Sequence, residues 1–289
     1  MPDVAVLATL LERKIFIESA LEQRLPSVDA EPREVHAAMH YAVMNGGKRI
    51  RPVIALATAE LGGLDPDQIL DAACAIEFVH TASLILDDLP SMDDSDSRRD
   101  QPATHRVYGE ATATLAALAL LAEAYALTAK NAAKLLPAQG VADIISVLSN
   151  TIGTAGLIHG QHVDLTTSST AATLEALEET YRQKAAVLFQ AAIAVPALLS
   201  NMNPQQCAAL ESYATDLGVA FQITDDLIDA REESAGDAPK VTFSTFLGED
   251  GAKEKIAALV AGASRALTIF GEDAVQLRVM AEYVSTRTV

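Results

Sequence analysis

Residues 67–88, DQILDAACAIEFVHTASLILDD, form one long apolar segment that ends in two adjacent aspartates. On a helix drawn through this segment, apolar side chains fall on almost every side, which is typical of a helix enclosed by other elements. Such a helix needs neighbours all around it. The segment therefore predicts a protein built around a central, buried helix.

Helical periodicity also recurs along the remainder of the chain, and no stretch has the pattern of a hairpin or of alternating parallel strands. Gly and Pro occur where helices are expected to begin and end. The predicted helices cover residues 4–24, 32–44, 51–63, 67–88, 111–136, 141–165, 174–200, 204–230, 251–270 and 272–286. Without a linker or an internal repeat, residues 1–289 are predicted to form a single all-α domain.

Composition excludes some classes of function. A formal charge of −18 argues against a general nucleic-acid surface, although divalent cations can still recruit an anionic substrate. Cys74 and Cys207 have no disulfide or metal-knuckle spacing, and no secretory signal is visible, so we expect a cytoplasmic protein. The best membrane candidate, residues 111–122, is too short for a bilayer and is followed by Glu123, so no membrane span is expected.

Two clusters of aspartates follow or close long apolar segments. The first comprises Asp87, Asp88 and Asp93, followed by Asp94 and Asp96, and the second comprises Asp225, Asp226 and Asp229. A D-D-x-x-D match alone is weak, since roughly 0.7 matches arise by chance with 39 acids in 289 residues. Acids at the end of an apolar helix nevertheless need a counter-charge. All-oxygen ligands suit Mg²⁺ together with substrate phosphates, whereas solvated helix ends are the simpler alternative.

Cations lie close to the first cluster and also on an earlier turn. Arg98 and Arg99 follow the first cluster directly, while GGKRIRP places Lys48, Arg49 and Arg51 on a glycine turn at a helix start. Guanidinium groups match phosphate oxygens in geometry and charge. On its own GGKRIRP is more often a charged surface turn. Together with the acids, it indicates two diphosphate sites, one held through metal and one held directly by cations.

At this point the chain resembles the trans-polyprenyl diphosphate synthase family. The resemblance runs along nearly the whole chain and is closest to bacterial carotenoid-pathway geranylgeranyl diphosphate synthases. It rests on GGKRIRP, FVHTASLILDDLPSMDD, RRDQPATHRVYGEATA, GLIHGQHVDL, YRQKAAVLF, AFQITDDLIDA and FSTFLGEDGAKEK. It implies a helical bundle of the isoprenoid synthase type with a deep central cavity, usually a homodimer. It also implies Mg²⁺-dependent, head-to-tail condensation of isopentenyl diphosphate with an allylic diphosphate.

The resemblance also implies residue roles. Magnesium ligands would be Asp87, Asp88, Asp93, Asp225 and Asp229, with Asp226 beside them as a further catalytic acid. The allylic diphosphate would be held by Arg98, Lys184 and Lys240, and Gln222 would help to orient it. Isopentenyl diphosphate would be held by Lys48, Arg51, His80 and Arg99.

Product length, by the same resemblance, depends on Ala82 and Ser83, roughly one turn before Asp87. Small side chains there favour a C20 product, with C15 farnesyl diphosphate as the alternative. The chain departs from the family at Ala185, where a hydroxyl is usual, and in a shortened segment before Lys240. A catalytically weak partner subunit therefore stays an alternative. A class I terpene cyclase is another, although it would not need GGKRIRP or Arg99.

Overall fold

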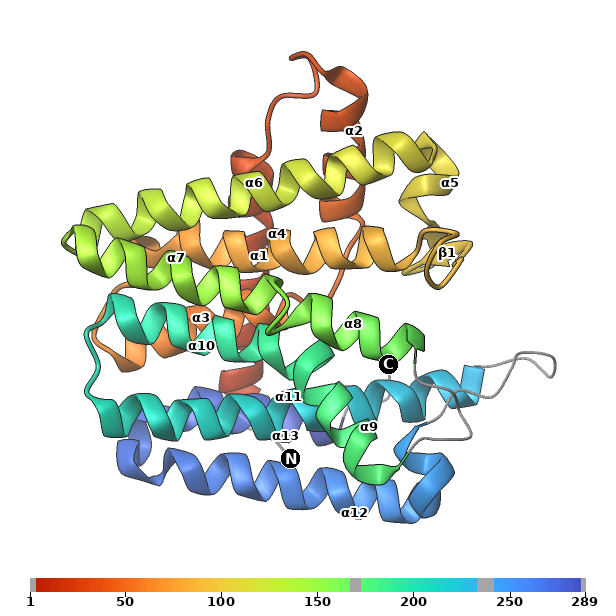
Figure 1. Cartoon of the computed structure of the whole chain (residues 1–289). Coiled ribbons are helices and arrows are strands. Elements are labelled where there is room, and N and C mark those ends of the chain that lie inside the picture. Colours follow the sequence, from red (N-terminus) through yellow and green to blue (C-terminus); the bar gives the residue numbers. More distant parts are fainter. Residues whose placement is uncertain (1–3, 167–172, 233–241, 287–289) are drawn as a thin grey trace.

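The structure is a computed structural model, and it describes residues 4–166, 173–232 and 242–286 (Figure 1). Its helices confirm the predicted all-α class. In chain order they are α1 (Val4–Arg24), α2 (Arg33–Met44), α3 (Ile50–Leu61), η1 (Pro66–Ile69), α4 (Leu70–Asp87), α5 (Thr104–Tyr108), α6 (Glu110–Leu135), α7 (Ala138–Ile152), α8 (Leu157–Thr166), α9 (Leu174–Tyr181), η2 (Arg182–Ala186), α10 (Val187–Leu199), α11 (Pro204–Glu232), α12 (Phe243–Ala266), η3 (Leu267–Ala274) and α13 (Val275–Thr286).

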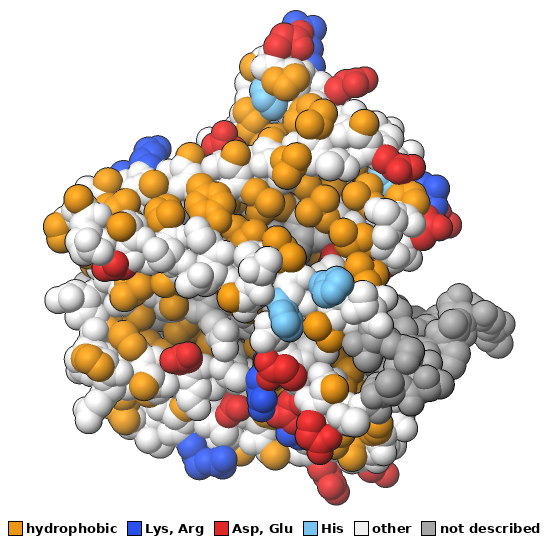
Figure 2. Space-filling model, viewed as in Figure 1, with side chains coloured by type: hydrophobic (Ala, Val, Ile, Leu, Met, Phe, Trp, Pro, Cys, Tyr) orange, Lys and Arg blue, Asp and Glu red, His pale blue; other side chains and the backbone are white. Residues whose placement is uncertain are grey.

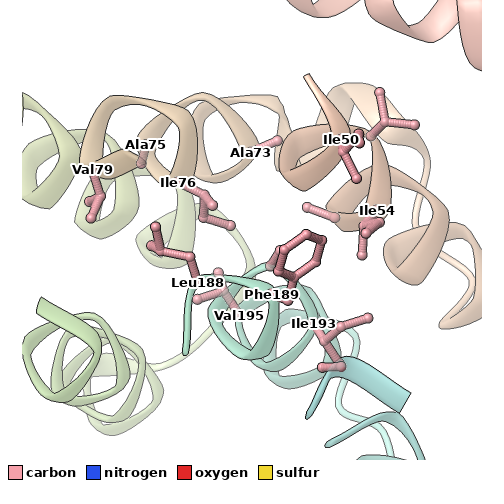
Figure 3. Close-up of a cluster of buried hydrophobic side chains, with 14 of the residues drawn as sticks. Ile50, Ile54, Ala73, Ala75, Ile76, Val79, Leu188, Phe189, Ile193 and Val195 are labelled. Carbon is pink, nitrogen blue, oxygen red and sulfur yellow. The ribbon is translucent and has the colours of Figure 1, made fainter. Parts of the chain in front are cut away.

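Helix α4 is the central helix that the sequence predicts. It packs against α6 along its length and also contacts α1, α2, α3 and α10 (Figure 1). Residues 71–79 are buried without exception, which matches the apolar character of every face of this segment. Ile76 and Val79 of α4 meet Leu188 and Phe189 of α10 in the core (Figure 3). This packing fixes the direction in which the acidic end of α4 points.

Two of the predicted helices are interrupted. Residues 141–165 were expected as one helix, but α7 ends at Gly153, which caps it, and α8 begins after Gly156. Residues 174–200 were also expected as one helix, but η2 is a π-helical turn between α9 and α10. A π turn changes the number of residues per turn without any Gly or Pro, so the hydrophobic pattern does not reveal it.

The expectation of no hairpin was wrong in one short segment. Strands β1 (Ser97–Arg98) and β2 (Gln101–Pro102) pair antiparallel directly after the first acid cluster. Arg99 and Asp100 form the turn, with φ values of 56° and 62°. Asp tolerates a left-handed conformation, but Arg-Asp is not one of the Asn-Gly or Asp-Gly pairs that identify such turns in a sequence. The hairpin lies at the end of α4 and positions Arg98 beside the acids.

Within the part of the chain that the structure describes, three helical segments are long and apolar enough, by length and composition alone, to cross a membrane: Pro66–Asp87, Glu110–Leu135 and Ala138–Thr166. The first of these is the central helix of the fold. In its most apolar 18-residue stretch, 72% is buried inside the protein, compared with 39% and 22% for the corresponding stretches of the other two segments. The apolar character of α4 is thus largely accounted for by its packing.

Candidate active site

The first acid cluster lies where α4 ends. Asp87 is the last residue of the helix and Asp88 its C-cap. The chain then turns back, since the backbone N–H of Asp93 donates to the Asp87 carbonyl at 2.9 Å. Burial raises the pKa of the Asp87 carboxyl to about 6, and the charges of Asp93 and Asp88 add to this rise, against the opposing effect of Lys184 and Arg98. Burial is thus the main reason why the charged form of Asp87 is disfavoured.

The second residue of the cluster has an ionic partner within the chain. Arg98 donates from Nε to both carboxylate oxygens of Asp88, at 3.1 and 3.3 Å, and from Nη2 to Oδ1 as well. Asp88 is 2% exposed, so this fork neutralises a buried carboxylate. The pair fixes Arg98 on the rim of the acid cluster. Asp87 and Asp93 are left as the carboxylates with the least internal compensation in this loop.

The second acid cluster lies on α11. Asp226 accepts hydrogen bonds from the hydroxyl of Tyr181 and from Gln222 Nε2, the latter at 3.0 Å. Burial raises the pKa of the Asp226 carboxyl to about 6, and the charges of Asp225 and Asp229 add to the rise although the two hydrogen bonds oppose it. Asp225 is half-buried and Asp229 is exposed. Gln222, which was predicted to orient the allylic diphosphate, thus also orients the Asp226 carboxylate.

Lys184 lies on the π turn between the two clusters. Its ammonium donates to Asp164 of α8 at 2.6 Å. Burial by itself lowers the pKa of Lys184, but the charges of Asp164, Asp87 and Asp93 outweigh this effect and raise the pKa. Tyr181, immediately before this turn, contacts Asp226 of the second cluster. Both acid clusters therefore border the same short segment, as the hypothesis of opposed clusters requires.

Two glycines allow this segment to lie close to its neighbours. A Cβ on Gly160 of α8 would lie 2.6 Å from the backbone nitrogen of Lys184, and a Cβ on Gly218 of α11 would lie 2.4 Å from Ala186 Cα. Only a residue without a side chain fits at either position. Helices α8 and α11 consequently hold the π turn from two directions by contact with its backbone. The position of Lys184 is set by these contacts.

These residues fit a Mg²⁺ site that substrate would complete. Among the described residues, no three His, Cys, Asp or Glu side chains are close enough to enclose a metal ion by themselves. Mg²⁺ is typically bound by one or two carboxylates together with substrate phosphates and water. Asp87 and Asp93 on one side, and Asp225 and Asp226 on the other, provide oxygen ligands of that kind. Burial is the main cause of the raised pKa values of Asp87 and Asp226, and a bound cation would stabilise the charged form of each carboxylate.

The second cationic set lies at the start of α3. Arg51 donates from Nη1 to His80 Nε2 at 3.3 Å, which places the proton of the neutral imidazole on Nδ1. Burial and the charge of Arg51 hold the pKa of His80 well below its usual value. The guanidinium carbon of Arg51 lies 4.7 Å from the ring centroid of Phe189 and 5.6 Å from that of Phe221. Cation–π contact with both rings fixes its orientation.

Arg99 joins this set through the glycine turn. Its Nη1 donates to the Gly46 carbonyl at 2.5 Å. Gly47 has a φ of +123°, and a Cβ there would lie 2.8 Å from the guanidinium carbon of Arg99. The positive φ favours glycine at this position, and the absence of a side chain lets the Arg99 guanidinium pack directly on it. Lys48 is exposed beside it. The structure thus brings Lys48, Arg51, His80 and Arg99 to one region.

The remaining predicted residues are placed as follows. Ala82 is fully buried in the core, and the Ser83 hydroxyl donates to the His80 carbonyl at 2.9 Å. Lys240 lies outside the described residues. Tyr181, Asp164 and Phe189 were not among the predicted site residues. All three lie in segments that carry the resemblance, Asp164 in GLIHGQHVDL and Tyr181 and Phe189 in YRQKAAVLF, and the contact of Tyr181 with Asp226 becomes visible only in the structure.

Comparison with known proteins agrees with this geometry. The sequence profile of the family described as "Polyprenyl synthetase" matches residues 32–276. The chain is 36% identical to the farnesyl diphosphate synthase of Geobacillus stearothermophilus, over 99% of each chain. It is 35% identical to the geranylgeranyl diphosphate synthase of Cyanophora paradoxa, over 98% of this chain and 96% of that protein.

Solved structures are similar over the same extent. The apo FPP/GFPP synthase of Zymomonas mobilis has a TM-score of 0.89 at 33% identity, covering 98% of this chain and 99% of that chain. The geranyltransferase of Legionella pneumophila has a TM-score of 0.90 at 31% identity, covering 98% of each chain.

Proposed function

The chain belongs to the polyprenyl synthetase family and is a prenyltransferase, and from this premise we propose how its site works and what it makes. The reaction is the head-to-tail condensation of isopentenyl diphosphate with an allylic diphosphate. The observation that carries the proposal is the position of Lys184 between two acid clusters, with a separate cationic set around Arg51. The allylic diphosphate binds at the acid clusters beside Lys184, and isopentenyl diphosphate binds at the cationic set around Arg51.

The allylic diphosphate is held by Arg98 and Lys184, with Lys240 as the third cation. Asp87, Asp88, Asp93, Asp225 and Asp229 are the proposed magnesium ligands, and Asp226 is held ready beside them by Tyr181 and Gln222. Bound Mg²⁺ would supply Lewis-acid stabilisation of the departing diphosphate. Asp88 contributes mainly through Arg98, since their fork already occupies its oxygens.

Isopentenyl diphosphate is held by Lys48, Arg51, His80 and Arg99. The low pKa of His80 keeps its imidazole neutral, so it accepts from Arg51 and presents Nδ1–H. Lys184 and Arg98 stabilise negative charge that develops on the allylic diphosphate as its carbon–oxygen bond breaks. The apolar rings of Phe189 and Phe221 lie behind Arg51 and exclude water from that side. Exclusion of water protects an allylic cation until the isopentenyl double bond attacks it.

We propose geranylgeranyl diphosphate as the product, with farnesyl diphosphate as the alternative. Support comes from Ala82, which is small and lies on α4 before Asp87. The two relatives described above carry one name each, so identity alone does not favour C15 or C20. Carotenoid biosynthesis is the pathway suggested by the motif ASLILDD.

We further propose a cytoplasmic homodimer of single-domain subunits that neither spans a membrane nor binds nucleic acid. Leu115 and Leu118 on α6 are 53% and 54% exposed, and apolar side chains are frequent over α6 and α7 in Figure 2. Such exposed apolar side chains on neighbouring helices favour burial against a second copy. Analytical ultracentrifugation of wild type and of a Leu115→Glu/Leu118→Glu variant tests this, and monomeric wild type would contradict it.

The activity is tested by incubation of the full chain with isopentenyl diphosphate, Mg²⁺ and labelled dimethylallyl, geranyl or farnesyl diphosphate. Chromatography of the products is expected to show chains up to C20, and none with a chelator present. Asp87→Asn is expected to abolish elongation. Asp94→Asn is the matched control in the same loop, because Asp94 pairs with Arg106 at the surface. No elongated product with any primer would refute the proposal.

A further inference from the structure

Arg49, the middle cation of GGKRIRP, points away from the site that its neighbours form. Lys48 is exposed, and Arg51 meets His80 and the two phenylalanine rings. The Arg49 side chain, by contrast, is 0% exposed. A ligand in the site therefore cannot reach it. The sequence places three cations on this turn, of which Lys48 and Arg51 were predicted to hold isopentenyl diphosphate, and the structure separates Arg49 from these two.

The buried guanidinium links three helices beneath the turn. Nη1 donates to Glu77 Oε1 of α4 at 2.8 Å, and Nη2 donates to the Val43 carbonyl of α2 at 2.6 Å. Nε lies 3.7 Å from Glu18 Oε1 of α1. Glu77 is itself 2% exposed. The contacts of Arg49 are therefore all structural, and all of them lie below the turn between α2 and α3.

The backbone at Arg49 shows what these contacts hold in place. Arg49 is the N-cap of α3 and has φ 50° and ψ 29°, which is the left-handed region. For a residue with a side chain this conformation costs about 1–2 kcal/mol and persists only where its surroundings enforce it. Gly46 and Gly47 before it also have positive φ values. The turn depends on the anchored Arg49 side chain because its own backbone preference is different.

We propose that Arg49 and Glu77 are positioning residues for the isopentenyl diphosphate site. They hold the Gly46–Arg51 turn so that Lys48 and Arg51 face the diphosphate together, and they touch neither substrate. Buried ion pairs contribute little net stability, but removal of one partner leaves an uncompensated charge that the structure must rearrange to solvate. Arg99 would move with the turn, since it donates to Gly46 and packs on Gly47. This inference rests on the proposed function.

The chain contains a matched control pair. Arg24 of α1 donates from Nε to Asp71 Oδ1 of α4 at 2.8 Å and from Nη1 to the Ala20 carbonyl at 3.0 Å. Like Arg49, it therefore joins a carboxylate of α4 to a backbone carbonyl. Asp71 is at the opposite end of α4 from Asp87, about 24 Å away along the helix axis. Loss of Arg24 removes an ion pair to the same helix, although Lys134 still donates to Asp71 at 3.0 Å, and it leaves the Gly46–Arg51 turn untouched.

The experiment measures binding of isopentenyl diphosphate to the full chain by calorimetry, together with KM for each substrate and the thermal midpoint. We expect Arg49→Met and Glu77→Gln to weaken isopentenyl diphosphate binding about tenfold or more. KM for the allylic diphosphate should change less than about twofold. Arg24→Met should lower the midpoint but leave isopentenyl diphosphate binding within about twofold of wild type. Arg49→Lys keeps the charge but cannot donate to Glu77 and to the Val43 carbonyl from two separate nitrogens. Its affinity for isopentenyl diphosphate should lie between those of wild type and Arg49→Met.

Each outcome decides the inference. Arg49→Met and Glu77→Gln that bind isopentenyl diphosphate like wild type would overturn it while leaving the proposed function intact. Equal losses in Arg24→Met would also overturn it, because the effect would then be one of general stability. Wild type that binds no isopentenyl diphosphate would overturn both. If Arg49→Met does not fold, Glu77→Gln decides alone, since it retains the shape of the glutamate.

Discussion

Replacement of Gly218 by Ala should damage both stability and catalysis through a single displacement. A Cβ at position 218 would lie 2.4 Å from Ala186 Cα and 2.6 Å from Ala186 Cβ. Carbon atoms in contact normally lie about 3.5–4.0 Å apart, so α11 and the π turn must separate by about 1.1–1.6 Å. Lys184 lies on that turn, two residues before Ala186. The displacement therefore acts directly on the lysine that we propose holds the allylic diphosphate.

Overpacking of this kind typically costs about 1–3 kcal/mol, which corresponds to a fall in thermal midpoint of roughly 2–12 °C for a chain of this size. Misplacement of a catalytic group by about 1 Å can reduce the rate about 100-fold. We therefore expect kcat/KM for the allylic diphosphate to fall by about two orders of magnitude. Calorimetry and steady-state kinetics at saturating isopentenyl diphosphate measure the two effects separately.

Gly140→Ala in α7 is the control. Its Cβ would lie 3.0 Å from Leu136 Cβ and 3.1 Å from Leu136 Cδ1, so Leu136, which lies between α6 and α7, has to shift much less than Ala186 would. Because Ala is a better helix former than Gly, this variant should be neutral or slightly stabilised. If Gly218→Ala keeps the midpoint and kcat/KM of wild type, the backbone contact does not position Lys184 and the reasoning is refuted.

Three further variants test other parts of the site. Because the folded-state pKa of Asp87 is raised from 3.8 to about 6, its ionisation removes stability as pH rises through that window. In metal-free protein Asp87→Asn should therefore gain about 1–3 kcal/mol at pH 8 and almost nothing at pH 3, and thermal unfolding with an equal gain at both pH values would contradict this. Tyr181→Phe keeps the ring contact with Phe243 and loses the hydroxyl on Asp226, so the Mg²⁺ concentration for half-maximal activity should rise about threefold to tenfold. Tyr213→Phe, which loses only a core hydrogen bond to the Leu277 carbonyl, should leave this Mg²⁺ requirement unchanged. Ala82→Tyr should shorten the product from C20, as seen by chromatography, and an unchanged chain length would remove Ala82 from the determinants of length.

The broad architecture and the acid clusters were predictable because they depend on local sequence. The uniform apolar character of residues 67–88 identified the central helix, and its acidic end could only lie where that helix stops. GGKRIRP likewise identified a turn, since Gly46 and Gly47 adopt backbone conformations that other residues avoid. In both cases the structure depends on residues that are close together in the sequence: the apolar side chains of one helix, and the backbone conformations of two adjacent glycines.

Contacts between distant segments were not predictable in the same way. The partner of Asp226 is Tyr181, which belongs to another helix, and the inward direction of Arg49 depends on Glu77, 28 positions away in sequence. The number of residues per turn in η2 is set by packing on α8 and α11, so the periodicity of residues 174–200 looks continuous. A single sequence shows which residue types are present and not which of them meet.

The π turn at Arg182–Ala186 has a consequence for insertions and deletions. Ordinary α-helical winding advances each residue by about 100°, and a π turn holds about one residue more than an α turn. The π turn therefore accommodates one extra residue while α9 and α10 on either side keep their orientation. Excision of one residue here would restore regular winding with Tyr181 still directed toward Asp226. Excision of one residue within α10 would instead rotate everything upstream by about 100° and carry the tyrosine away from Asp226, so a deletion should be tolerated better in the π turn than in the helix that follows it.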